Sequence, residues 1–119
     1  MIAAILGVPA LADLGLQVGA CRPRYRCEVA SVRSDVLNIA YLEMGDRSAP
    51  AVILVHGWPD AARGWWEIAE ALDKSGWRVI VPDNRGTGTT TFLSSITLRD
   101  GSAVALVQDT LDLADSLGL

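Results

Sequence analysis

The residues with the clearest chemical potential form a turn, His56-Gly57-Trp58-Pro59, directly after the apolar run at residues 52–55. This run contains β-branched residues and is typical of a strand that is buried on both faces. Pro59 cannot continue a strand ladder. A buried strand that leads through a glycine turn into a helix presents backbone N–H groups to a ligand at the carboxyl end of the strand. Donors placed there can stabilise negative charge that develops on an oxygen atom.

A second loop follows a second apolar run. Residues 78–82 lead into Asp83-Asn84-Arg85-Gly86-Thr87-Gly88. A phosphate-binding glycine loop is one alternative for this segment. However, Thr91 stands where a third glycine would be expected, and no lysine follows as in a P-loop. A single G-x-G pair is weak evidence, so we do not expect nucleotide binding.

In this order, the two motifs resemble those of the α/β-hydrolase family, especially its epoxide-hydrolase and haloalkane-dehalogenase-like members. The resemblance covers residues 28–119. It implies that the backbone N–H of Trp58 is one donor of an oxyanion hole, and that His56 and Gly57 support the turn that holds it. The other donor in the family is the residue after the nucleophile. The alternative is a strand-to-helix turn with a buried aromatic ring and no chemistry.

The second motif has its own expected contacts. We expect Asp83 and Arg85 to hold their loop together through hydrogen bonds or a local salt bridge. In the resembling family a serine usually follows the final glycine by two positions. Thr90 stands there in this chain and keeps the hydroxyl group.

The parts of a complete catalytic site are missing from the sequence. A nucleophile elbow needs G-x-S-x-G, or Asp in place of Ser, on a strand–helix turn, and neither pattern occurs. His56 is the one histidine, and the resemblance implies that the catalytic histidine follows the nucleophile. We therefore predict no nucleophile and no general base. The leading hypothesis is an N-terminal fragment of a hydrolase, inactive alone, whose complete form cleaves a small-molecule ester, epoxide or haloalkane.

Composition limits the other function classes. At 119 residues the chain is one domain at most. Half of its residues are hydrophobic and 20% are charged, as in globular proteins. A formal net charge of −4 disfavours binding to nucleic acid or to an anionic membrane. Cys21, Cys27 and His56 supply too few ligands for a zinc site, so we expect no metal. The resemblance implies no cofactor.

Residues 1–27 are expected to be an N-terminal extension of uncertain structure. They contain a segment, Val18-Gly19-Ala20-Cys21, that resembles a bacterial lipoprotein cleavage box. However, no basic residue precedes it, as a signal peptide would require. We therefore favour a cytoplasmic protein over an exported one, and we expect no membrane-spanning helix.

The hydrophobic pattern of residues 28–119 predicts an α/β fold with the order β-β-β-α-β-α. The expected elements are strands at 28–32 and 36–44 that form an antiparallel hairpin, a strand at 51–55, a helix at 61–75, a strand at 77–81, a loop at 86–97 and a helix at 102–117. Asp60 is the expected N-cap of the first helix. Because a helix separates the third and fourth strands, these two strands should be parallel.

Each helix should bury one apolar stripe. In the first helix this stripe is Trp65, Ile68, Ala69 and Leu72, with Trp66 partly exposed. In the last helix it is Val104, Val107, Leu111 and Ala114. Asp109, Asp112 and Asp115 are expected to form a solvated face, and a site for a divalent ion is the alternative.

The resemblance also implies a sheet order in which the strand before His56 lies between the strand ending at Asp83 and the nucleophile strand. Residues 52–55 would then form an exposed apolar edge, and such edges pair with other chains. Self-association through this edge is expected. The alternative hypothesis for the whole chain is a non-catalytic interaction module that pairs through the same edge.

Overall fold

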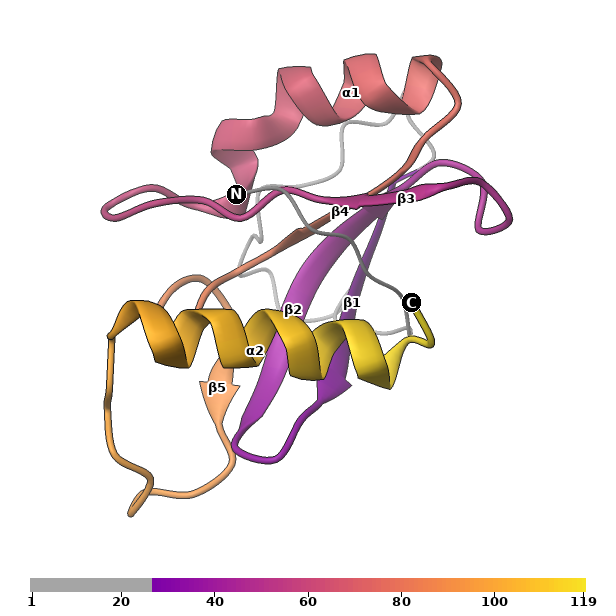
Figure 1. Cartoon of the computed structure of the whole chain (residues 1–119). Helices are drawn as coiled ribbons and strands as arrows, with labels where there is room; N and C mark the ends of the chain where they lie inside the picture. The colour runs from indigo at the N-terminus through magenta and orange to yellow at the C-terminus, as the bar shows by residue number, and fades with distance from the viewer. Residues whose placement is uncertain (1–26) are drawn as a thin grey trace.

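Strand β2, Leu37–Met44, is the centre of a mixed five-stranded sheet (Figure 1). The computed structural model describes residues 27–119. One edge of β2 pairs antiparallel with β1, Cys27–Arg33. The other edge pairs antiparallel with β4, Arg78–Pro82, and with the short strand β5, Thr91–Phe92. Strand β3, Ala51–Ile53, pairs parallel with β4, which gives the path β1-β2-β4-β3.

The predicted hairpin and the predicted parallel pair are confirmed. Ser34 closes the hairpin turn, because its backbone N–H donates to the carbonyl of Leu37 and its hydroxyl accepts the N–H of Leu37. The third strand is shorter than predicted, although the N–H of Leu54 still donates to the carbonyl of Ile80. β3 pairs on one side only within residues 27–119, yet Ile53 and Leu54 are fully buried, whereas Val52 and Val55 are half-buried.

Alternating residues of the strands divide the core into two layers. Ile39 and Tyr41 of β2 and Ile80 of β4 face one side, against Leu113 of α2, Ala103–Ser116. The other layer, against the segment that contains α1, is made of Leu42, Met44, Leu54, Val79, Val81, Ala62, Trp66 and Ala69. The two helices therefore cover opposite faces of the sheet (Figure 1).

The first helix begins differently from the prediction. A 3₁₀ turn, η1 at Ala62–Trp65, precedes the α-helix α1, Trp66–Lys74. Asp60 is not the N-cap; its carboxylate instead accepts the N–H of Ala61.

The tighter 3₁₀ turn, with about 3.0 residues per turn, rotates the following helix relative to the predicted stripe. Trp66 is therefore buried and Trp65 half-buried, which reverses the prediction for this pair. Ile68, predicted to lie in the core, is exposed, whereas Ala69 is fully buried. The helix ends at Lys74, and Gly76, with φ +85°, follows the C-cap Ser75.

The final helix has the predicted bounds within one residue, and Ser102 caps it through a hydrogen bond from the N–H of Ala105. Its predicted core stripe is wrong for three of the four residues. Val104, Val107 and Leu111 are exposed, whereas Ala114 packs partly buried against the core. The buried residues are instead Asp109 and Leu113, so Asp109 does not belong to a solvated face.

The predicted loop at residues 86–97 contains strand β5. Thr91 and Phe92 pair with Asn38 and Leu37 of β2. A strand of two residues is too short to show an alternating pattern, so the hydrophobic pattern does not predict it.

The predicted extension at residues 1–27 lies outside the described residues, except that Cys27 begins β1. The same holds for the cleavage-box segment ending at Cys21. Within residues 27–119, neither helix is long and apolar enough to cross a membrane.

Candidate functional site

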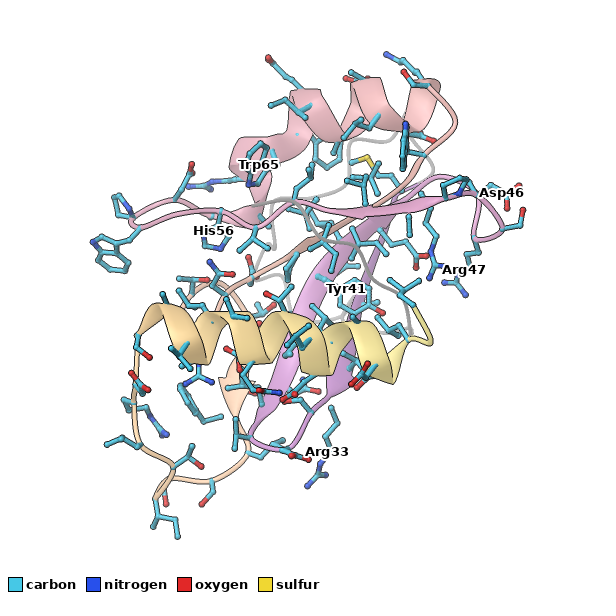
Figure 2. All side chains as sticks on the ribbon, in the orientation of Figure 1. Arg33, Tyr41, Asp46, Arg47, His56 and Trp65 are labelled. Atoms are coloured by element: carbon cyan, nitrogen blue, oxygen red, sulfur yellow. The ribbon has the colours of Figure 1, made fainter. Side chains whose placement is uncertain are left out.

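The turn predicted to carry chemistry lies where the chain leaves β3, at the end of this strand away from the loop at residues 45–50 that joins β2 to β3 (Figure 1). His56 lies at this point (Figure 2). It is nearly fully buried, with 5% of its surface exposed. Two residues later, the side chain of Trp58 is 88% exposed, so the alternative of a buried aromatic ring does not describe this turn. The Trp58–Pro59 peptide bond is cis.

Both nitrogens of the His56 ring take part in hydrogen bonds. The backbone N–H of Asn84 points at Nε2 over 3.2 Å, and Nδ1 lies 3.0 Å from the carbonyl oxygen of Gly57. Because a backbone N–H can only donate, Nε2 must be the acceptor. The partners therefore assign the neutral ring with its hydrogen on Nδ1, which donates to Gly57. His56 thus connects its own turn to the loop after β4.

The side chain of Asn84 makes a second connection between the same two segments. Its Nδ2 donates to the backbone carbonyl of His56 at 2.7 Å. Thr87 supports this arrangement from within the loop, since its hydroxyl donates to the carbonyl of Asn84 at 2.7 Å and lies 3.3 Å from Nε2 of His56. The sequence motif contained Asn84 and Thr87, but its pattern alone did not predict their contacts with the histidine.

The peptide group between Gly57 and Trp58 is fixed through its carbonyl oxygen. That oxygen receives the Nδ1 hydrogen of His56 and the N–H of Asp60, at 2.9 Å. A trans peptide group is planar, with its N–H opposite its C=O, so these bonds also set the direction of the Trp58 N–H. No hydrogen bond within residues 27–119 uses that N–H. The turn therefore presents an oriented donor at the carboxyl end of β3.

Asp83 organises the second loop from a buried position. Its carboxylate accepts the backbone N–H of Thr89 at 3.1 Å. Gly88, with φ +50°, lies so close to this carboxylate that a Cβ atom there would overlap it. The glycine is therefore required both by its conformation and by the space that Asp83 occupies.

Asp83 holds its loop through a hydrogen bond, as expected, but the alternative of a local salt bridge with Arg85 is not formed. Arg85 instead extends to α2, where Nε and Nη2 donate to the two carboxylate oxygens of Asp109, each over 2.6 Å. Its Nη1 donates to the carbonyl of Asp100 at 2.9 Å. The hydrogen bonds to Asp109 raise the pKa of Arg85 above its usual value, although burial acts in the opposite direction. The apparent solvated carboxylate of α2 is thus half of a buried ion pair.

The hollow beside the second loop is small, and the described residues contain no cluster that could bind a metal ion. No group of three or more His, Cys, Asp or Glu residues within residues 27–119 could hold a metal ion. The hollow, under α2, has room for about one water molecule and is lined by Leu37, Ile39, Pro82, Asp83, Asn84, Arg85, Asp109, Thr110 and Leu113. Small-molecule sites are typically at least about 300 Å³, so this hollow is not a substrate site.

The sequence matches a family model and several curated proteins. The model, described as the alpha/beta hydrolase fold, matches residues 50–119. Epoxide hydrolase A of Mycobacterium tuberculosis is 33% identical over 87 residues, which is 73% of this chain and 26% of that protein. Epoxide hydrolase 4 of Homo sapiens is 32% identical over 88 residues, which is 73% of this chain and 23% of that protein.

Solved structures give the same result. A Klebsiella pneumoniae protein described as a candidate epoxide hydrolase superposes with a TM-score of 0.74 at 43% identity, covering 76% of this chain and 30% of that one. Potato (Solanum tuberosum) epoxide hydrolase I superposes with a TM-score of 0.65 at 32% identity, covering 76% and 28%. The chain therefore spans about a quarter of the length of the curated relatives it matches.

Proposed function

The chain belongs to the α/β-hydrolase fold family, and we propose that its His56-Gly57-Trp58-Pro59 turn supplies one donor of the oxyanion hole of an epoxide hydrolase-like enzyme. The proposed donor is the backbone N–H of Trp58. The similarity to epoxide hydrolases implies a small-molecule substrate, and an epoxide is the class we propose. Esters and haloalkanes are the other substrate classes considered for this fold.

The observation that carries the proposal is the oriented N–H of Trp58. Its peptide group is held through the Gly57 carbonyl, while the N–H itself bonds to nothing within residues 27–119. Preorganised donors of this kind act on charge that develops in the transition state and need no rearrangement during the reaction. In this proposal His56 and Gly57 support the turn, and His56 is not a general base because both ring nitrogens are already engaged.

We further propose that the chain does not catalyse hydrolysis by itself. Its sequence contains no nucleophile elbow and no second histidine. An oxyanion donor without a nucleophile and base retains only a small part of the catalytic effect. A substrate pocket of ordinary size would also need residues beyond those that line the hollow under α2.

A chimera provides the test. Residues 28–119 would replace the matching segment of the Klebsiella pneumoniae relative, and hydrolysis of styrene oxide would be measured beside the unfused chain. Replacing the Trp58 amide by a backbone ester, through incorporation of the hydroxy-acid analogue of tryptophan, removes the N–H but keeps the side chain. We expect kcat to fall about 10²- to 10³-fold.

Trp58→Phe is the matched control, because it changes the exposed side chain and keeps the amide. We expect it to retain most of the activity of the chimera. Equal activity of the ester variant and the unmodified chimera would overturn the oxyanion role. Turnover of styrene oxide by the unfused chain would overturn the proposed inactivity.

A second candidate function is an interaction module that pairs through β3. Backbone N–H and C=O groups of successive residues point alternately to the two edges of a strand. The Pro50 carbonyl and the Leu54 N–H, which flank β3, point to β4 because they bond to that strand. By this alternation the N–H of Ala51 points to the edge that is open within residues 27–119. Unpaired edges of this kind form strand pairs with other chains.

Size-exclusion chromatography with light scattering tests this candidate. We expect the purified chain to self-associate. Ala51→Pro, which removes the edge donor, should weaken the association, whereas Ala51→Ser, which keeps it, should not. A monodisperse monomer that unfolds cooperatively would contradict the candidate.

A further inference from the structure

We propose that Asp109 is a positioning residue for the Trp58 turn, acting through Arg85, Asn84 and His56 in sequence. The inference rests on the proposed function of the turn and adds the residues that hold it in place. Asp109 lies on α2, on the opposite side of the sheet from the helix that follows the turn. Hydrogen bonds, together with the peptide bond between Asn84 and Arg85, connect these two regions.

The first link joins α2 to the loop after β4. Arg85 binds both carboxylate oxygens of Asp109 over 2.6 Å, and only 10% and 11% of these two side chains is exposed. Two parallel charge-assisted bonds fix the guanidinium in orientation as well as in position. The bond from Arg85 to the Asp100 carbonyl adds a third anchor on the segment before α2.

The second link runs along the backbone from Arg85 to Asn84. The two residues share a planar peptide group, so an anchored Arg85 restricts the Asn84 backbone. Asn84 donates its N–H to Nε2 of His56 and its side-chain amide to the His56 carbonyl. These two bonds hold the ring and the backbone of His56 at the same time.

The third link carries the orientation to the donor itself. With Nε2 occupied as an acceptor, the ring hydrogen of His56 lies on Nδ1 and binds the Gly57 carbonyl. The other tautomer would place a hydrogen on Nε2 facing the Asn84 N–H, and it would leave the Gly57 carbonyl without this bond. The tautomer of His56 therefore reports whether the contacts that connect Asp109 to the Trp58 turn are intact.

The experiment uses the tautomer as its readout. The chain has one histidine, so ¹⁵N-histidine labelling gives a single pair of ring signals even if the chain self-associates. We expect the untagged wild-type chain to show the neutral Nδ1–H form. Asp109→Asn removes the charge of the pair without changing its shape. In this variant we expect a mixture of tautomers and about tenfold faster hydrogen exchange at the Asn84 amide.

Asp115→Asn is the matched control, because Asp115 is an exposed carboxylate on the same helix. It should leave both readouts at their wild-type values. A folded Asp109→Asn chain with wild-type ring signals and wild-type Asn84 exchange would overturn the proposal, and it would assign the ion pair to anchoring α2 alone. If Asp109→Asn does not fold, Arg85→Lys provides the same comparison, because lysine keeps the charge but loses the paired geometry.

Activity separates this proposal from the proposed function. In the chimera, Asp109→Asn should lower kcat about 10- to 100-fold and leave KM unchanged, as expected when a reacting group is misplaced. The ring signals require no substrate. They therefore test the positioning role even if the backbone-ester variant shows that the Trp58 N–H has no part in catalysis.

Discussion

The hydroxyl oxygen of Thr90 accepts the backbone N–H of Ala40 at 2.9 Å, although the two residues lie 50 positions apart. The same hydroxyl donates to the carbonyl of Asp83 at 2.7 Å. One buried side chain thus attaches the loop after β4 to the central strand β2. The Thr90 hydroxyl, which stands where the family usually has serine, therefore stabilises the loop that contacts His56.

Thr90→Val tests this attachment because valine has nearly the same shape and no hydroxyl. The N–H of the fully buried Ala40 would lose its acceptor. We expect the free energy of unfolding to fall by about 1–3 kcal/mol. Urea denaturation measures the change, and Thr90→Ser, which keeps the hydroxyl, should lose less. Equal stability of the two variants would show that the hydroxyl is unimportant.

The two glycines of the same loop should respond differently to alanine. Both have positive φ, +77° at Gly86 and +50° at Gly88, which costs an alanine about 1–2 kcal/mol. Only Gly88 also abuts the carboxylate of Asp83; no atom lies within 4 Å of the position of a Cβ at Gly86. Gly88→Ala should therefore destabilise the chain more than Gly86→Ala in thermal unfolding. The reverse order would contradict the contact with Asp83.

Two leucines of α2 test which face of that helix is buried. Leu113 is 1% exposed and packs in the core, whereas Leu111 is 52% exposed. Leu113→Ala should lower the free energy of unfolding by about 2–5 kcal/mol. Leu111→Ala should change it by about 0.5 kcal/mol or less. Similar losses in urea denaturation would support the stripe that the sequence predicted.

Asp100 should make the stability of the chain depend on pH in the acid range. The backbone N–H of Ser102, and then its hydroxyl, donate to this carboxylate and lower its pKa. A lowered pKa contributes stability above the unfolded-state value of about 3.9, and that stability disappears as the pH falls through the folded-state value.

Asp100→Asn should therefore be less stable than the wild type at neutral pH, with the difference shrinking below about pH 4. Thermal melts at several pH values measure this. Asp115→Asn serves as the control, since the Asp115 carboxylate accepts no hydrogen bond within residues 27–119. A difference that stays constant down to pH 2 would contradict the prediction.

The strands could be predicted because their signal is local. The short gap between the apolar segments at 28–32 and 36–44 was enough to predict the hairpin. A helix between two apolar runs was enough to predict the parallel pair. The helix faces could not be predicted as well. The 3₁₀ turn before Trp66 rotates α1. In α2, apolar residues lie on two faces, and the more regular stripe is not the one around Leu113 that is buried.

In the candidate site, too, the local turn could be predicted from the sequence, whereas a contact between distant segments could not. The motif predicted the turn at Trp58 and the role of its neighbours, and that role remains a prediction. The partner of Arg85 could not be found from the motif. Asp83 is nearer in sequence, but its carboxylate is occupied by Thr89, and the available carboxylate comes from Asp109 on another element.

The link from His56 to Asn84 has a consequence for synthesis on the ribosome. Asn84 follows His56 by 28 residues, and translation adds about 5–20 residues per second. The imidazole therefore emerges about 1–6 seconds before the amide that fixes it. The β1–β2 hairpin needs only about 1–10 μs once both strands are available. In the nascent polypeptide, the β1–β2 hairpin can therefore form before residue 84 has been added. The Trp58 turn acquires its final geometry only after Asn84 has been translated.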